Sequence, residues 1–352
     1  MTTPFPLFSL PYLPLKQVLD NVGSEALVIL SMCSLRSKNI AVSYRGPSKS
    51  VRLKLRFGSY DYLEDSTYFY LTILLMVEEK GKLPIDYNTL ETVRIGSFEK
   101  IPVVMEKHSI KGVNLITYWE DRITGLVAIG DYAREVFNQD IYQVRLYDKE
   151  ADDDHRRAAE WIKNSQKTIQ SLRCDFKPKI DKDIDFILEN FNYTEKLFLF
   201  VRPSEHYSPS RMPSFQVDSL HVRFSFWIKQ DHLLTMNCKY IWLENSTLSS
   251  HDFNVLLKHW MNGGCSQLKV LRVDVEELID YEVVVLDGVE FTQRADDVER
   301  VFVDEVDAHT LIRGGIDIKR PTDNAKLTIY NGGNHLKHFW MIVWPDSAEN
   351  SY

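Results

Sequence analysis

Short apolar segments recur at a nearly constant spacing through the middle of this chain. Their central residues are separated by 26, 27, 23, 21 and 28 positions, and they are Leu146, Leu172, Leu199, Val222, Leu243 and Leu271. A unit of one helix and one strand at this period leaves an apolar face that only a neighbouring unit can cover, so several units must stack. The spacing predicts an irregular, leucine-rich-repeat-like α/β solenoid over residues 126–275, with parallel strands in sequence order. An ordinary α/β layer is the alternative.

Successive residues of a strand point to opposite faces, so the strands of this region allow us to predict which side chains lie on the surface. If Ile241 and Leu243 point into the core, Trp242 must point out, and Arg272 does the same beside Leu271. Exposed tryptophan and arginine are typical of binding interfaces, and arginine suits an acidic partner. We therefore predict a target-binding surface at Arg145, Arg223, Trp242 and Arg272. The alternative is that Trp242 packs beneath a loop and that the arginines pair with local carboxylates.

Residues 276–352 have the alternating pattern of antiparallel strands. Residues 282–286 and 289–291 flank Asp287-Gly288, a pair that favours two-residue hairpin turns. Gly314-Gly315 separates two further apolar segments, and residues 325–330 and 339–344 flank a turn at 331–334. We expect a β-rich cap that covers the unpaired edge of the stack.

Residues 46–125 are predicted to form a linker and a β-rich connecting region. Residues 46–50 are polar, and residues 51–57 alternate between apolar and charged side chains, as a half-buried strand does. Residues 68–76 indicate a buried strand, and residues 103–106 and 113–119 indicate a hairpin. The predicted fold class is therefore α+β or α/β.

Residues 1–45 indicate a small helical module. Pro14 suits the first turn of a helix, where its missing N–H needs no partner. Leu15, Val18 and Leu19 then form one apolar stripe, and Ser24 can cap a second helix. A module of this size cannot bury its own apolar surface. It requires a partner protein or, alternatively, its own downstream domain.

Several stretches resemble one known family. Leu10-Pro11 followed by helical leucines, residues 248–264 with the strand after them, residues 314–320 and the aromatic segment 339–344 are similar to the F-box-B subfamily expanded in nematodes. Members combine an F-box with a type 2 F-box-associated domain. This chain differs where Arg36-Ser37 replaces a closing tryptophan and where Thr322-Asp323-Asn324 replaces an Asp-Gly turn.

The resemblance implies a substrate-recognition subunit of a Skp–cullin–F-box ubiquitin ligase. It implies that a Skp-type adaptor, and through it a cullin, binds the N-terminal module, while the C-terminal region binds an unknown target protein. The implied adaptor contacts are Leu10, Pro11, Leu15, Val18, Leu19, Leu27 and Leu30. A scaffold that acts without an adaptor is the alternative, and an enzyme of unrecognised type is a more distant one.

Composition and motif searches favour a non-enzymatic role. The formal net charge of −8 argues against nucleic acid or an anionic membrane as the main partner. The four cysteines lie far apart and are predicted to be buried thiols in a reducing compartment, the cytoplasm or nucleus. The sequence has no phosphate-binding Gly-rich loop, zinc-protease motif or nucleophile elbow, so we expect no cofactor, no metal and no catalytic residue.

Overall fold

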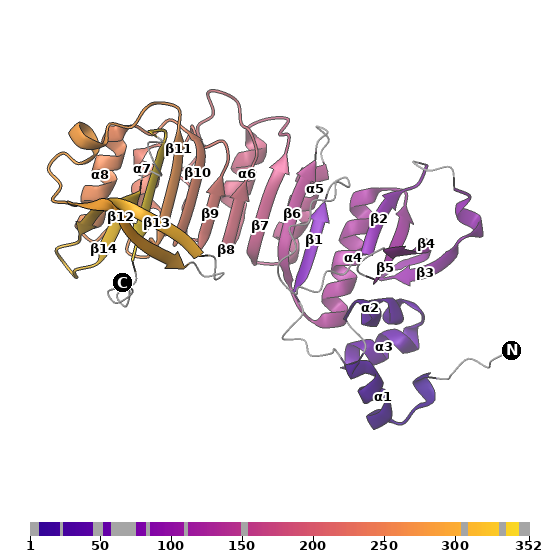
Figure 1. Cartoon of the computed structure of the whole chain (residues 1–352). Helices are drawn as coiled ribbons and strands as arrows, with labels where there is room; N and C mark the ends of the chain where they lie inside the picture. The colour runs from indigo at the N-terminus through magenta and orange to yellow at the C-terminus, as the bar shows by residue number, and fades with distance from the viewer. Residues whose placement is uncertain are drawn as a thin grey trace. The chain divides into compact units, whose positions relative to one another are not determined.

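The computed structural model forms two compact units, Met1–Ile169 and Gln170–Tyr352, coloured along the chain in Figure 1. The residues that it describes are 7–21, 24–44, 52–57, 75–81, 85–108, 112–148, 154–303, 309–330 and 336–344. The predicted domain boundaries at residues 45, 125 and 275 stay predictions.

The first unit begins with the predicted helical module. It comprises η1 (Leu7–Ser9), α1 (Tyr12–Asp20), α2 (Ser24–Met32) and α3 (Leu35–Tyr44). Pro14 lies in the first turn of α1, as its ring geometry predicts. Lys16 Nζ lies 2.8 Å from the Asp20 carboxylate, which also accepts a hydrogen bond from the Tyr44 hydroxyl. These contacts link the end of α1 to the end of α3.

Helix α4 (Arg122–Phe137) packs against this module and carries much of the first unit's core. Asp121 caps its start by accepting a hydrogen bond from the Thr124 amide at 2.8 Å. The Tyr132 hydroxyl donates to Ser31 Oγ of α2 at 3.0 Å, and Lys38 of α3 lies 2.8 Å from Glu135. The module therefore packs on its own downstream helix, the arrangement that the sequence left open as an alternative.

The same unit holds a small sheet in the order β2-β5-β4-β3. Its strands are β2 (Leu75–Glu79), β3 (Glu91–Ile95), β4 (Phe98–His108) and β5 (Gly112–Trp119), with η3 (Tyr87–Thr89) before β3. Strands β4 and β5 are antiparallel, which confirms the predicted hairpin. The predicted strand at 68–76 reaches the described residues only at its end, in β2, and the predicted linker at 46–50 lies outside them.

Strand β1 (Leu53–Phe57) and strand β6 (Ile141–Asp148) pair in parallel, followed by α5 (Asp154–Ser165). Leu53, Leu55 and Phe57 are buried on one face of β1, which confirms the predicted half-buried strand. On α5, His155, Ala158, Ala159 and Ile162 form a buried stripe at helical spacing. Residues 126–137, at the start of the predicted solenoid region, form the greater part of α4.

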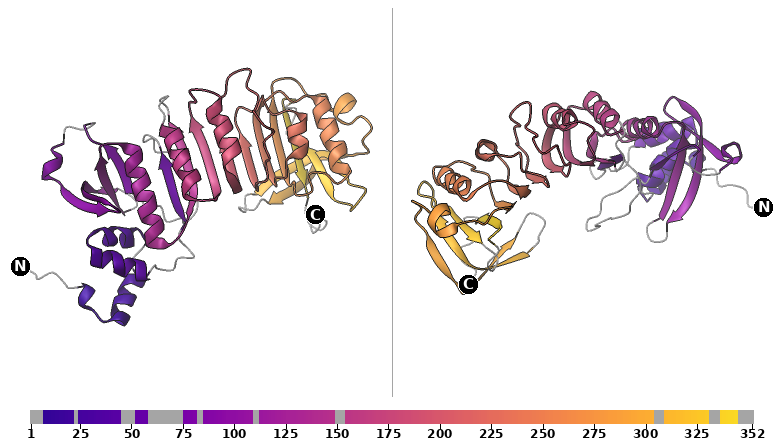
Figure 2. Two further views of the ribbon diagram at one scale, coloured as in Figure 1. Left: turned by 180° about the vertical axis from the view of Figure 1, so that it is seen from behind. Right: turned by 90° about the horizontal axis from the view of Figure 1, so that it is seen from above.

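The second unit contains the predicted helix–strand units. These are β7 (Thr168–Phe176), α6 (Lys182–Asn190), β8 (Asn192–Leu199), β9 (Ser219–Val222), α7 (Gln230–Thr235), β10 (Tyr240–Ser246), α8 (Ser250–Met261) and β11 (Val270–Val275). Strands β8, β9, β10 and β11 are neighbours in sequence order and all parallel, as predicted. Figure 2 shows that helices α6 to α8 cover one face of these strands. The leucine-rich-repeat-like solenoid as a whole stays a prediction.

The buried faces of these strands match the predicted apolar centres. Leu199, Val222, Leu243 and Leu271 are between 0 and 3% exposed. Ser249 caps helix α8. The Asp252 amide donates to Ser249 Oγ at 3.4 Å, and the Ser249 amide donates to the Asp252 carboxylate at 2.7 Å. The sequence analysis missed α7, a single short helix without an extended apolar stripe.

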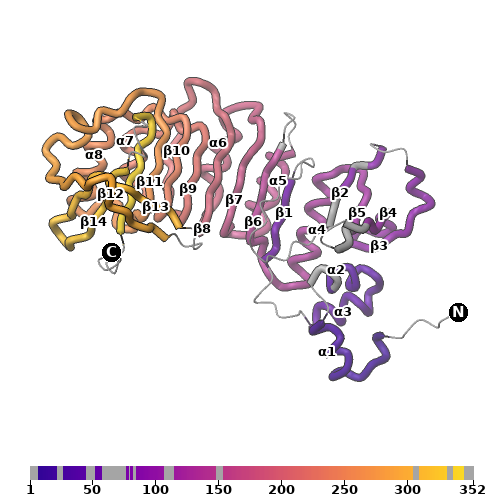
Figure 3. Tube along the Cα trace, in the orientation of Figure 1, coloured from indigo at the N-terminus to yellow at the C-terminus, as the bar shows by residue number. Residues whose placement is uncertain are grey.

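The C-terminal strands extend the same sheet, in the order β11-β15-β14-β13-β12. They are β12 (Thr292–Val303), β13 (His309–Lys319), β14 (Lys326–Tyr330) and β15 (His338–Val343), and Figure 3 follows their course. Strand β15 is antiparallel to both β11 and β14. The edge of β11 is therefore covered by a C-terminal strand, as expected, and the predicted pairing of residues 325–330 with 339–344 is confirmed.

The predicted hairpin at residues 282–291 is wrong. Tyr281–Val285 forms a π-helical turn, η4, and the next strand starts only at Thr292. Asp280 caps the turn by accepting from the Val283 amide at 3.0 Å. Buried Asn254 donates to the carbonyls of Val285 and Asp287 at 2.8 and 2.9 Å. Tertiary hydrogen bonds from α8 therefore override the strand preference of the valines.

The predicted separation of two strands by Gly314-Gly315 is also wrong. Strand β13 runs without interruption through both glycines, whose φ angles are +61° and +96°. The pairing of β12 with β13 jumps from Arg294 opposite Gly315 to Glu299 opposite Arg313. The glycines thus accommodate a bulge inside a pair of strands, which is the other role of glycine in a strand pattern.

Candidate functional site: the open strand face of the second unit

The strands of the second unit have one face that the helices do not cover, called here the open strand face. Residues of six neighbouring strands lie side by side on it, one from each of β8, β9, β10, β11, β15 and β14. This aromatic row consists of Phe198, His221, Trp242, Arg272, Trp340 and Tyr330, each the registered partner of the next. Such cross-strand neighbours stand about 5 Å apart, close enough for direct stacking.

The side chains of the aromatic row stack on one another. The rings of His221 and Trp242 lie 4.3 Å apart and only 5° from parallel. The Arg272 guanidinium lies 4.0 Å from the centre of the Trp340 ring and 5.8 Å from that of Trp242. Each such contact contributes about 0.5–1.5 kcal/mol beyond simple burial. Trp242 is nevertheless 40% exposed.

His221 contacts a carboxylate of the neighbouring strand. Its Nε2 lies 2.5 Å from Glu244 Oε1. Burial of the ring lowers the pKa of His221 below its usual 6.5, and the positive charges of Arg223 and Arg173 lower it further, although Glu244 acts in the opposite direction. Burial therefore favours the uncharged form of the ring that stacks on Trp242.

Two arginines flank one phenylalanine beside the aromatic row. Phe200 follows β8 and is only 8% exposed. The guanidinium of Arg173, from β7, lies 4.6 Å from its ring centre, and that of Arg223, which follows β9, lies 4.3 Å from it. Asp175 and Glu244 lie 3.7 and 3.6 Å from these two guanidiniums. Arg173 and Arg223 are called here the arginine pair.

The hairpin of β12 and β13 covers the other end of the open strand face. Val270, Phe302, Ile312 and Ile342 form a buried cluster, and partly buried aromatic residues pack around it. These aromatic residues are Tyr240, Tyr330, Trp340 and Trp344. The exposed part of the face is therefore the part formed by β7 to β10.

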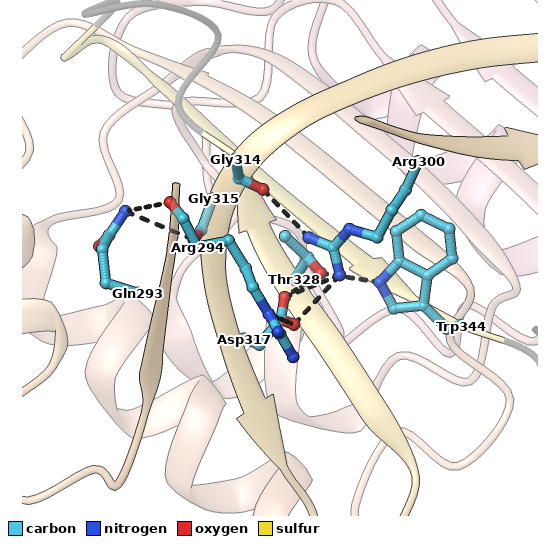
Figure 4. Close-up of polar contacts among 8 residues, drawn as sticks. All are labelled: Gln293, Arg294, Arg300, Gly314, Gly315, Asp317, Thr328 and Trp344. Atoms are coloured by element: carbon cyan, nitrogen blue, oxygen red, sulfur yellow. Dashed lines mark hydrogen bonds and ion pairs between the residues drawn. The ribbon is translucent and has the colours of Figure 1, made fainter. Parts of the chain in front are cut away.

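A buried carboxylate holds this hairpin in place (Figure 4). Asp317 of β13 accepts from Arg294 at 2.7 Å, from Arg300 at 3.0 and 3.1 Å, and from Thr328 of β14 at 2.7 Å. The Arg300 guanidinium also donates to the Gly314 carbonyl at 3.0 Å and lies 4.9 Å from the centre of the Trp344 ring. Asp317 thus links three strands through charge-assisted hydrogen bonds.

Three of the four predicted target-binding residues lie together on this face. Trp242 and Arg272 belong to the aromatic row, and Arg223 belongs to the arginine pair. Arg145 lies on β6, in the first unit. The sequence analysis missed Arg173, Phe200, His221 and Trp340. Arg173 has the same parity beside Leu172 as Arg272 has beside Leu271, a signal that could have found it.

The predicted adaptor contacts divide by exposure. Leu19 and Leu27 are 2% exposed, while Leu10, Leu15 and Leu30 are half-buried and Pro11 and Val18 are exposed. Three further apolar side chains of the module are strongly exposed, namely Tyr12, Leu13 and Leu35 at 71, 70 and 61%. Their positions outside the apolar stripe explain why the helical periodicity did not select them.

Other kinds of site find little support in the described part of the chain. Its residues contain no group of three or more His, Cys, Asp or Glu that could hold a metal ion. Cys174 and Cys238 are buried, as predicted, but the prediction is wrong for Cys33, which is exposed at the end of α2. Burial raises the pKa of the Cys238 thiol to about 11, so this thiol is not activated. None of the described helices is long and apolar enough to span a bilayer.

Comparison with known proteins links the open strand face to a family. Residues 210–273 match the model of the family described as F-box associated. This stretch is therefore similar to an F-box-associated domain. It contains β9, β10 and most of β11, and therefore His221, Arg223, Trp242 and Arg272.

Two proteins of Caenorhabditis elegans are similar to this chain. "Uncharacterized protein F59B2.8" is 21% identical over 98% of this chain and 79% of its own length. "Uncharacterized protein F59B2.9" is 25% identical over 34% of this chain and 27% of its own length. No solved structure gives a significant match.

Proposed function

We propose that this chain is the substrate-recognition subunit of a Skp–cullin–F-box ubiquitin ligase, belonging to the F-box-B subfamily. The observation that carries the proposal is the F-box-associated domain at residues 210–273, preceded by an N-terminal helical module. The chain performs no bond chemistry in this role. It binds an adaptor with one unit and a target with the other, and so raises the target's concentration near the ligating machinery.

The exposed apolar residues of α1 and α3 support adaptor binding. Tyr12, Leu13 and Leu35 are each at least 61% exposed, an unusual amount for side chains of this size on one small module. Burial of one such side chain by a partner stabilises a complex by about 1.5–3 kcal/mol. Pro11 and Val18 from the implied contact set are exposed beside them.

Adaptor binding is tested with the full chain and a purified Skp-type adaptor. Leu13→Asp combined with Val18→Asp changes only exposed residues, so the module keeps its fold while adaptor binding is lost. Leu19→Asp is a poor test because Leu19 is 2% exposed and packs inside the module. Gln17→Asp, at an exposed position of the same helix, is the matched control for the added charge. Wild-type adaptor affinity in the double variant contradicts the proposed contact.

The second candidate function is a scaffold that acts without an adaptor. It is favoured by the packing of the module on α4, through Tyr132 with Ser31 and Lys38 with Glu135. In this case α2 and α3 complete the first unit's core, and α1 serves only as its outer layer. If the wild-type chain binds no Skp-type adaptor but still binds its target, the scaffold function is favoured over the ligase function.

A further inference from the structure

We propose that the arginine pair, Arg173 and Arg223, binds two carboxylates of an acidic, extended segment of the target protein. This assignment rests on the proposed function for the identity of its ligand as a target. It deepens that function by naming a chemical class and by centring the contact on Arg173 and Phe200, beside the aromatic row.

The hydrogen-bond donors of the arginine pair are available. Asp175 and Glu244 form ion pairs with these guanidiniums at 3.7 and 3.6 Å, distances too long for hydrogen bonds. Among the described residues, neither guanidinium donates a hydrogen bond. The side chains of Arg173 and Arg223 are 41 and 42% exposed. A guanidinium has five N–H donors in a planar fork that matches a carboxylate. Two such groups on one surface provide a site for two negative charges.

The phenylalanine between them holds the pair in position. Both guanidiniums lie within 4.6 Å of the centre of the Phe200 ring, which is itself buried. Stacking restricts these long side chains before a ligand arrives, so less conformational entropy is lost on binding. Glu244 contacts His221 through Oε1 at 2.5 Å and faces Arg223 with Oε2 at 3.6 Å, so a bound carboxylate gains by approaching Arg223 more closely than Glu244 does.

Stacking within the protein argues against a nucleic-acid ligand. A sheet that binds single-stranded nucleic acid offers aromatic ring faces on which bases stack. Here the ring of Trp242 stacks on His221, and guanidiniums lie over the ring of Phe200. The exposed chemistry is therefore guanidinium donors with ring edges beside them, which suits carboxylates and short apolar side chains.

The spacing of the pair suits an extended chain. Arg173 belongs to β7 and Arg223 follows β9, with β8 between them. Both guanidiniums lie within 4.6 Å of the same ring centre, so they are less than twice that distance apart. Alternate residues of an extended peptide are about 6.5–7 Å apart on one side. Two glutamates at alternate positions reach both guanidiniums with their flexible side chains. An acidic segment with alternating glutamates is therefore the expected ligand.

The test is fluorescence polarisation of the full chain with a labelled peptide, Gly-Ser-Glu-Val-Glu-Val-Glu-Ser-Gly. A second peptide has glutamine for each glutamate, and a third has phosphoserine at those positions. We expect the glutamate peptide to bind at least about tenfold more tightly than the glutamine peptide, since each bidentate charged contact is worth about that factor. Raising the salt concentration weakens this difference.

Substitutions of Arg173 and Arg223 test whether the arginine pair binds the glutamate peptide. Arg173→Gln and Arg223→Gln each weaken binding of the glutamate peptide about tenfold, whereas Arg211→Gln, at an exposed arginine of the same unit, leaves it unchanged. Phe200→Leu keeps both charges but removes the stacking surface, and gives a smaller loss. If a glutamine variant is unstable, Arg173→Lys and Arg223→Lys keep the charge and lose the fork geometry, so they still weaken binding.

Three outcomes overturn the proposal: equal binding of the glutamate and glutamine peptides, wild-type binding in both glutamine variants, or binding of the phosphoserine peptide alone. The adaptor assay on the same variants separates this site from the proposed function. Retained adaptor binding with no peptide binding removes the inference and leaves the function intact. Peptide binding in a chain that binds no adaptor keeps the site and removes the ligase role.

Discussion

Replacement of Asp317 by asparagine should destabilise the second unit by about 3 kcal/mol. Asp317→Asn keeps the shape of the side chain but removes the negative charge that Arg300 and Arg294 share. The Asp317 side chain is 9% exposed and that of Arg300 is 22% exposed, so the loss leaves a largely buried guanidinium without its counter-charge. Breaking a buried pair in this way costs about 3–5 kcal/mol. Arg294 is 40% exposed, and its share is at most about 0.5 kcal/mol.

Urea unfolding followed by tryptophan fluorescence measures this loss. Trp344 reports on the site directly, because its indole N–H donates to Thr328 and its ring lies beside Arg300. Since the chain has two units, hydrogen exchange of the β13 and β14 amides is needed to assign the transition to the second unit. Protection of these amides should fall by the same free energy.

Glu299→Gln is the matched control in the same hairpin. Glu299 pairs with Arg313 at 2.8 Å, but their side chains are 51 and 62% exposed. Loss of this ion pair should therefore lower the free energy of unfolding by no more than about 0.5 kcal/mol. Arg300→Gln should cost nearly as much as Asp317→Asn, and the double variant should cost less than the sum. The reasoning fails if Asp317→Asn costs less than about 1 kcal/mol or no more than the control.

Two further predictions concern single residues of the second unit. Because the pKa of His221 is lowered from 6.5 on folding, the unfolded chain takes up a proton at this residue at a higher pH than the folded chain does. The free energy of unfolding should therefore fall as the pH drops below about 6.5. In urea titrations from pH 5 to 8, His221→Gln should reduce that dependence. Gly315→Ala should cost at least about 2 kcal/mol, since φ is +96° and the new Cβ lies 2.9 Å from the Ile329 carbonyl oxygen. Gly263→Ala, at φ +91° with nothing within 4 Å, should cost only about 1 kcal/mol by thermal unfolding; equal losses contradict the steric argument.

Local patterns were enough to predict many of the regular elements. Helix α8 has a serine cap and an apolar stripe, and the strands β8 to β11 have buried centres at the predicted residues. The failures are of a different kind. The valines of η4 favour a strand, but the amide of Asn254, about thirty positions earlier, binds the carbonyls of that turn. A contact of that range leaves no trace in the local pattern.

The candidate site, like the fold, could be predicted only as far as local sequence patterns reach. Period-two alternation identified Trp242, Arg223 and Arg272 as residues of one face. It could not give the register between strands, which depends on loop lengths and on packing. The placement of Arg173 beside Phe200, and of Trp340 beside Arg272, follows from that register alone. The exposed apolar side chains of α1 could likewise not be predicted, because the packing of α2 and α3 on α4 determines which faces of the module are exposed.

The pairing of β15 with β11 has a consequence for the nascent chain. Strand β11 ends at Val275 and β15 ends at Val343, 68 positions later (343 − 275). At a synthesis rate of about 5–20 residues per second, the ribosome needs about 3–14 s to produce the strand that covers this edge. Until then, β11 presents unpaired backbone groups that can join a wrong strand. This topology therefore requires that the edge of β11 be kept from pairing with a wrong strand during those seconds.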